Sequence, residues 1–77
     1  MNFVFDYSKL RGKIREVFGT EAIFAEKLQM SKGTLSFKLN GKAEWTNQEM
    51  VKATKLLGEP IAEINTLFFT ERLGKTN

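Results

Sequence analysis

The chain has 77 residues, a formal net charge of +3 and neither Cys nor His, and hydrophobic residues make up 42% of it. This length indicates one domain, spanning residues 1–77, and the composition is typical of a folded globular protein. Without thiols and imidazoles the chain lacks the usual nucleophiles, general bases and zinc ligands, so we expect no enzyme, no metal and no cofactor.

Charge and hydropathy restrict the partners further. No apolar run approaches the roughly 18 residues that cross a membrane, and the first residues do not resemble a signal peptide. We therefore expect a cytoplasmic protein, and one without a small-molecule substrate because so small a core leaves little concave volume. Residues 8–42 carry eight basic and three acidic side chains, which favours either an anionic partner or a solvated basic face.

Side-chain caps and glycines predict five helices, which places the chain in the all-α class. The first is expected over residues 8–18, capped by Ser8 and ended by Gly19. Its apolar stripe comprises Leu10, Ile14, Val17 and Phe18. The second begins after its cap Thr20 and ends near Leu28, with Phe24, Ala25 and Leu28 facing inward.

A tight turn at residues 29–31 separates the second helix from a third, which is capped by Ser31 and reaches Leu39. The fourth begins with a capping box formed by Thr46 and Glu49, and Gly58 follows its end. Its inner face is expected to carry Met50, Ala53, Thr54 and Leu57. A fifth short helix is expected from Pro60 to about Asn65, with Ile61 and Ile64 facing inward.

The two ends of the chain leave two alternatives open. Phe3 and Phe5 alternate with polar residues, and residues 67–69 form an apolar run of strand-like type. These ends either pair as a short β-ladder or the second run extends the last helix. Phe68 and Phe69 are too apolar for a free tail, and we expect one ring in the core and the other at a two-fold dimer contact.

The functional signal lies in residues 20–42, where a three-residue turn joins two short helices. This is the pattern of a helix-turn-helix, whose second helix enters a DNA major groove. On a helical wheel Leu35 and Leu39 face the core, and Phe37 faces outward. Phe37 then contacts thymine methyl groups, or the helix is rotated and its ring is partly buried.

The stretch A-E-K-L-Q-M-S-K-G-T-L-S-F-K-L-N-G-K resembles the helix-turn-helix of the lambda-repressor-like (XRE) superfamily, and the small size is similar to that of phage Cro-type repressors. The resemblance implies a five-helix fold and a homodimer that binds a duplex DNA operator in a phage lysis–lysogeny switch. The residues that it assigns to the core of the motif are Ala25, Leu28, Leu35 and Leu39. The residues that it assigns to DNA bases are Lys32, Gly33, Thr34, Ser36 and Phe37.

Phosphate contacts are expected from Thr20, Arg11, Arg15, Lys38, Asn40 and Lys42. Two residues depart from the family pattern. Glu21 would repel phosphate unless it is paired, and Gln29 replaces a common Gly, so its backbone either adopts a left-handed conformation or the turn differs. Trp45 is expected to cover the core beside the fourth helix, with a phosphate contact of its indole N–H as the alternative.

The rival interpretation is an interaction protein of the same fold. With Gly33 and Phe37 on the outward side, few side chains there can form bidentate hydrogen bonds to bases. The chain would then be a modulator that binds the DNA-binding domain of a phage repressor instead of DNA.

Overall fold

The structure, a computed structural model, describes residues 5–71, so the expected alternation around Phe3 lies outside the described residues. Within this range the chain is all-α and has five α-helices and one 3₁₀-helix. Their bounds are α1 (Ser8–Phe18), α2 (Glu21–Leu28), α3 (Lys32–Leu39), α4 (Asn47–Leu56), the 3₁₀-helix η1 (Ile61–Glu63) and α5 (Ile64–Phe68). No helix in residues 5–71 is long and apolar enough to span a membrane.

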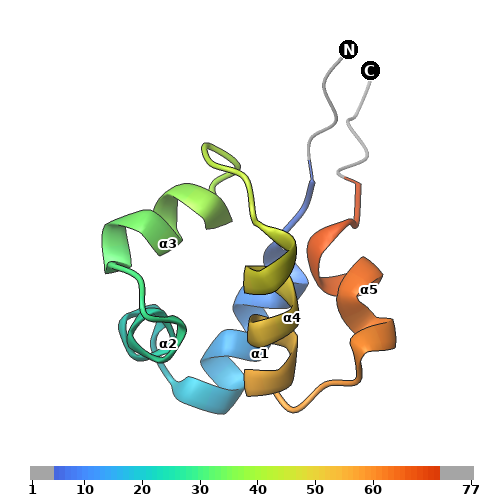
Figure 1. Cartoon of the computed structure of the whole chain (residues 1–77), viewed down its shortest axis with the longest axis horizontal. Helices are drawn as coiled ribbons and strands as arrows, with labels where there is room; N and C mark the ends of the chain where they lie inside the picture. Colours follow the sequence, from blue (N-terminus) through green and yellow to red (C-terminus); the bar gives the residue numbers. More distant parts are fainter. Residues whose placement is uncertain (1–4, 72–77) are drawn as a thin grey trace.

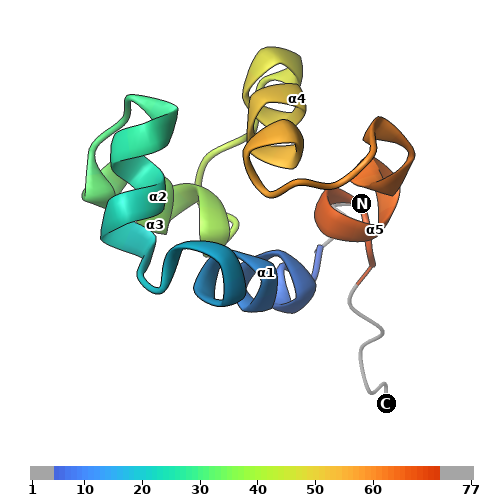
Figure 2. The same ribbon diagram turned by 90° about the horizontal axis from the view of Figure 1, so that it is seen from below.

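The helices are arranged along one long axis. α2 and α3 lie at one end and α5 lies at the other, with α1 and α4 between them (Figure 1). The view from below shows α1 and α4 on opposite sides of the space between these two ends (Figure 2). Each end therefore presents its own surface.

Local capping sets most of the helix boundaries. The hydroxyls of Thr20 and Ser31 accept the backbone N–H groups of Ile23 and Thr34. The capping box predicted at Thr46 and Glu49 is present in both directions. These side chains satisfy donors that a helix start leaves without an intrahelical acceptor, so the sequence fixes where α2, α3 and α4 begin.

The cap expected from Ser8 is wrong. The N-cap of α1 is Tyr7, whose side chain makes no capping hydrogen bond. Instead the Asp6 carboxylate accepts the backbone N–H of Ser8 at 2.8 Å. A carboxylate one residue before the N-cap thus meets the positive end of α1, where negative charge is favourable.

One apolar core joins all five α-helices. Its buried residues are Leu10, Ile14, Phe24, Ala25, Leu28, Leu35, Leu39, Met50, Ala53, Leu57, Leu67 and Phe68. The inner faces predicted for α2 and α4 are confirmed. Val17 and Ile61, which were expected to face inward, are 44% and 46% exposed. Val17 lies in the last turn of α1. Ile61 lies in a 3₁₀-helix, whose period of three residues differs from the 3.6-residue period of the α-helix that was expected there.

The end of the chain combines both alternatives. α5 continues past the expected Asn65 through Phe68. Beyond it the backbone N–H of Asp6 donates to the carbonyl of Thr70 at 2.7 Å, and Phe5 and Glu71 form an isolated antiparallel bridge. The ends are therefore tied by a minimal ladder rather than by true strands.

The two aromatic residues at this end have different surroundings. Phe68 is 1% exposed and packs edge-on against Trp45, with ring centroids 4.9 Å apart. Phe68 is therefore the one of the two rings that lies in the core, as the sequence predicted for one of them, and it is not available for a dimer contact. Phe69 is 44% exposed and meets the ring of Phe5 edge-on.

Candidate functional site

The turn between α2 and α3 has a single strained residue. Gln29 ends α2 with φ 62° and ψ 41°, the left-handed conformation that the sequence left as one of two alternatives. Its backbone N–H and that of Met30 donate to carbonyls in the last turn of α2. The turn therefore closes with its donors satisfied, and Ser31 starts α3 at once.

The two helices pack closely through small and branched side chains. Ala25 and Leu28 from α2, and Leu35 and Leu39 from α3, are all buried, as expected for the core of this motif. A small residue at position 25 lets the two helices approach, and the leucines fill the space between them. The inner side of α3 is thereby fixed, and its outer side is determined with it.

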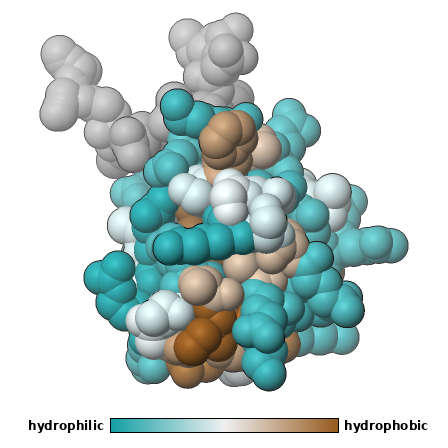
Figure 3. All heavy atoms as spheres, turned by 90° about the vertical axis from the view of Figure 1, so that its left-hand side faces the viewer, coloured by the Kyte–Doolittle hydropathy of each residue, from teal (hydrophilic) through white to brown (hydrophobic). Residues whose placement is uncertain are grey.

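The outer side of α3 exposes an aromatic ring. Phe37 is 58% exposed, the largest value among the exposed large apolar residues within residues 5–71. The helix is not rotated to bury it, so the outward orientation predicted from the wheel is confirmed. Lys32, Gly33 and Thr34 are also exposed, and Ser36 is half-buried. Figure 3 views this end of the molecule and shows apolar surface emerging between polar residues.

Most polar groups on this side of α3 already have partners. The hydroxyls of Ser31 and Thr34 hydrogen-bond to each other at 2.9 Å. The Asn40 amide donates to the Ser36 hydroxyl at 3.4 Å. Among the polar residues expected to contact bases, Thr34 and Ser36 are thus engaged. Only the Lys32 side chain makes neither a hydrogen bond nor an ion pair within residues 5–71.

Lys38 does not face a phosphate, and its expected role is wrong. It is 8% exposed, and its ammonium donates to the Glu44 carbonyl at 2.6 Å and pairs with Glu49 at 3.0 Å. The same ammonium lies 5.9 Å from the centre of the Trp45 ring. Lys38 therefore fastens the segment between α3 and α4 instead of reaching outward.

This pairing changes the ionisation of Glu49. Burial alone would raise its pKa, but hydrogen bonds from the Thr46 backbone and Lys38 and the charge of Lys38 outweigh burial, so the pKa of Glu49 lies below its ordinary value. The carboxylate thus stays charged where it both caps α4 and holds Lys38.

Two more residues expected to contact phosphates are engaged within the protein. The Arg11 guanidinium donates to the Asn40 side-chain oxygen at 2.8 Å and pairs with Glu21 at 3.5 Å. Glu21 was expected to repel phosphate unless it was paired. Its ion pair with Arg11 meets that condition. Arg15 and Lys42 are exposed and make no side-chain hydrogen bond or ion pair within residues 5–71.

Trp45 covers the core, which was the first of the two roles that the sequence left open for it. Its ring packs against the core cluster, and its indole N–H is buried with no acceptor among the described residues. A buried N–H cannot reach a phosphate, so that alternative is wrong. Sequence reasoning passed over Ile23, an exposed apolar residue on α2 whose signal was its place off the inner stripe.

Comparisons with known proteins place this geometry in a phage context. Residues 3–71 match the family described as "Protein of unknown function (DUF739)". Among solved structures the chain is similar to the solution structure of the modulator of repression of the temperate bacteriophage TP901-1 from Lactococcus lactis, with 42% sequence identity and a TM-score of 0.74. That similarity covers 84% of this chain and 88% of that chain. A search of the curated proteins finds no match. These matches support a small all-helical phage-type regulator and do not extend to the lambda-repressor-like family.

Proposed function

We propose that this chain, which belongs to the family described as "Protein of unknown function (DUF739)", is a modulator of a phage repressor. In this role it binds the repressor protein through the exposed side of α2 and α3, in the cytoplasm of a bacterial host. The observation that carries the proposal is the exposed ring of Phe37 on the outward side of α3. The similarity to a phage modulator of repression supports it.

An exposed aromatic ring suits a protein partner better than a DNA groove. Aromatic side chains that enter an apolar pocket dominate the energy of protein interfaces. Base recognition, in contrast, relies on hydrogen-bonding side chains such as Arg, Asn and Gln. On the outer side of α3 only Lys32 offers an uncommitted polar group, so we expect the partner to supply an apolar pocket for Phe37 beside an acidic rim for Lys32.

Direct DNA binding remains a second candidate because of the basic side chains at this end. Lys32, Lys42 and Arg15 are exposed. They could contact phosphates, which would give affinity with little sequence preference. Three of the residues expected to join them, Lys38, Arg11 and Asn40, are held by internal contacts. The homodimer on an operator belongs to this candidate alone.

Replacing Phe37 separates the two functions. Phe37→Ala should change the free energy of unfolding by less than about 0.5 kcal/mol, because the ring is exposed. It should weaken binding to the phage repressor that the chain is proposed to modulate by about 2 kcal/mol or more, roughly 30-fold in Kd. Isothermal titration calorimetry measures the affinity, and thermal unfolding followed by circular dichroism measures the stability.

The matched control is Phe69→Ala, which removes the other phenylalanine that is exposed within residues 5–71, at the opposite end of the molecule (Figure 1). Repressor affinity should be unchanged in this variant. The proposal is wrong if the wild-type chain does not bind the repressor and instead shifts operator DNA alone in a gel, with Lys42→Ala weakening that complex.

A further inference from the structure

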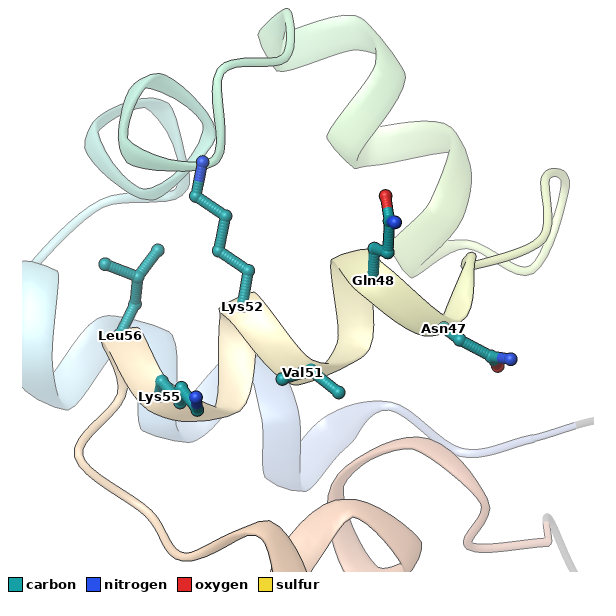
Figure 4. A pocket seen from close by; sticks show the side chains of 6 residues that line it. All are labelled: Asn47, Gln48, Val51, Lys52, Lys55 and Leu56. Atoms are coloured by element: carbon teal, nitrogen blue, oxygen red, sulfur yellow. The ribbon is translucent and has the colours of Figure 1, made fainter.

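The outward side of α4 carries a hollow that the proposed function does not use. Its volume is about 560 Å³. Its lining residues are Asn47, Gln48, Val51, Lys52, Lys55 and Leu56. Figure 4 shows Gln48, Lys52 and Leu56 projecting from α4 toward α2 and α3, with the other three along the other edge. The hollow therefore follows the helix over more than two turns.

The floor and the rim of the hollow differ in character. Val51 and Leu56 are half-buried and supply apolar surface, whereas Lys52 and Lys55 are exposed at the rim. None of the lining residues is acidic. An apolar floor with a basic rim complements a segment that carries a bulky apolar side chain flanked by carboxylates.

Lys52 and Lys55 are not paired with carboxylates within residues 5–71, unlike two other lysines of the chain. Lys13 and Lys38 pair with the carboxylates of Glu59 and Glu49 at 2.7 and 3.0 Å. Lys52 donates instead to the neutral side-chain oxygen of Gln29 at 3.1 Å. Lys55 forms no ion pair within residues 5–71. Both cations are thus available to an acidic partner.

The shape of the hollow excludes a small ligand as its main occupant. Small-molecule pockets enclose most of the surface of their ligand. This hollow is formed by one side of a single ten-residue helix and stays open to solvent (Figure 4). Its lining residues recur at spacings of three and four, the pattern along which a second helix packs.

We infer that the hollow on α4 docks an acidic segment of the repressor, with an apolar side chain placed over Val51 and carboxylates at Lys52 and Lys55. The inference rests on the proposed function. The hydrogen bond from Lys52 to Gln29 joins α4 to the turn between α2 and α3, so the hollow borders the turn that leads into α3. The repressor would then be held at two points, one on α3 and one on α4.

Charge reversal tests the inference. The variant Lys52→Glu/Lys55→Glu should bind the repressor at least ten-fold more weakly by isothermal titration calorimetry, and the dependence of Kd on salt should become shallower. Val51→Ala should weaken binding several-fold without a charge change. Circular dichroism and thermal unfolding confirm that each variant is folded.

The matched control is Lys9→Glu/Arg15→Glu on α1. It makes the same change in net charge and, like the first variant, places one Glu in the last turn of a helix. This control should lower affinity less than two-fold. Equal losses in the two double variants, or no loss in either, overturn the α4 site while Phe37→Ala still reports on the proposed function. Absence of any binding by the wild-type chain refutes both.

Discussion

The two sides of α3 differ in which kind of side chain they bury and which they expose. The inward side buries Lys38 beside Leu35 and Leu39, and the outward side exposes Phe37. In an ordinary surface helix these placements would be exchanged. The buried ammonium is compensated by a carbonyl and a carboxylate, whereas no ring contact covers the exposed Phe37 ring among residues 5–71.

The difference assigns different tasks to the two sides. Lys38 serves the architecture, because its contacts with Glu44 and Glu49 fix the chain between α3 and α4. Phe37 makes no comparable contact within the described residues, and its exposure fits the proposed role in recognition. α3 was expected to contact DNA through both Lys38 and Phe37. In the structure Lys38 faces inward, and Phe37 is exposed.

The largest expected effect on stability comes from the inward side. Lys38→Ala should lower the free energy of unfolding by about 2–3 kcal/mol, because the Glu44 carbonyl loses its side-chain donor and the Glu49 carboxylate loses its cation and keeps only the Thr46 N–H. Chemical denaturation followed by circular dichroism measures the loss.

Three further variants sharpen this result. Lys38→Met keeps the apolar stem, so it should cost less than Lys38→Ala, and its combination with Glu49→Gln measures the coupling of the pair. Lys42→Ala, at an exposed lysine, should stay within about 0.5 kcal/mol of wild type. If Lys38→Ala is as stable as Lys42→Ala, the contrast between the two lysines has no energetic basis.

A smaller effect is expected on the pH dependence of stability. The pKa of Glu49 is lowered in the folded protein, so its charged form stabilises the fold above its ordinary value of 4.5, and this contribution is lost as the pH falls through the folded pKa. Glu49→Gln should therefore flatten the acid side of a plot of unfolding free energy against pH. Superimposable acid profiles for the wild type and Glu49→Gln would contradict this role.

The smallest expected effect lies on the outward side. A Cβ at Gly33 would meet no atom closer than the Ser31 hydroxyl at 3.9 Å, which is an ordinary contact. Gly33→Ala should thus stabilise the protein by about 0.5–1 kcal/mol through the higher helix propensity of Ala. The melting temperature measures this change. A lower melting temperature would show that the outward side of α3 is more tightly packed than its exposure indicates.

Local rules made much of the fold predictable. Thr20, Ser31 and the Thr46–Glu49 box mark helix starts through contacts that span three residues, and the sequence alone displays them. The left-handed backbone of Gln29 was also among the predicted alternatives, because a turn this short allows few backbone conformations.

Long-range partners escaped prediction. The wheel that turned Phe37 outward also places Lys38 within about 60° of Leu35, but nothing in the helix reveals that Glu49 on α4 would receive its charge. The pairing of Arg11 with Asn40, 29 residues away, is hidden for the same reason. Periodicity gives the direction of a side chain, and only the packed fold supplies its partner.

Trp45 is the single tryptophan of the chain, and its ring lies against Phe68 with the indole N–H shielded from solvent. An indole whose N–H is shielded from water and which packs against apolar side chains fluoresces at shorter wavelength than a fully hydrated one, because fewer mobile dipoles relax its excited state. The emission of the native chain is therefore an intrinsic optical gauge of whether the segment from α3 to α4 is closed over α5. That gauge needs no label, and it reports on the segment next to α3 while both proposed contact surfaces remain unmodified.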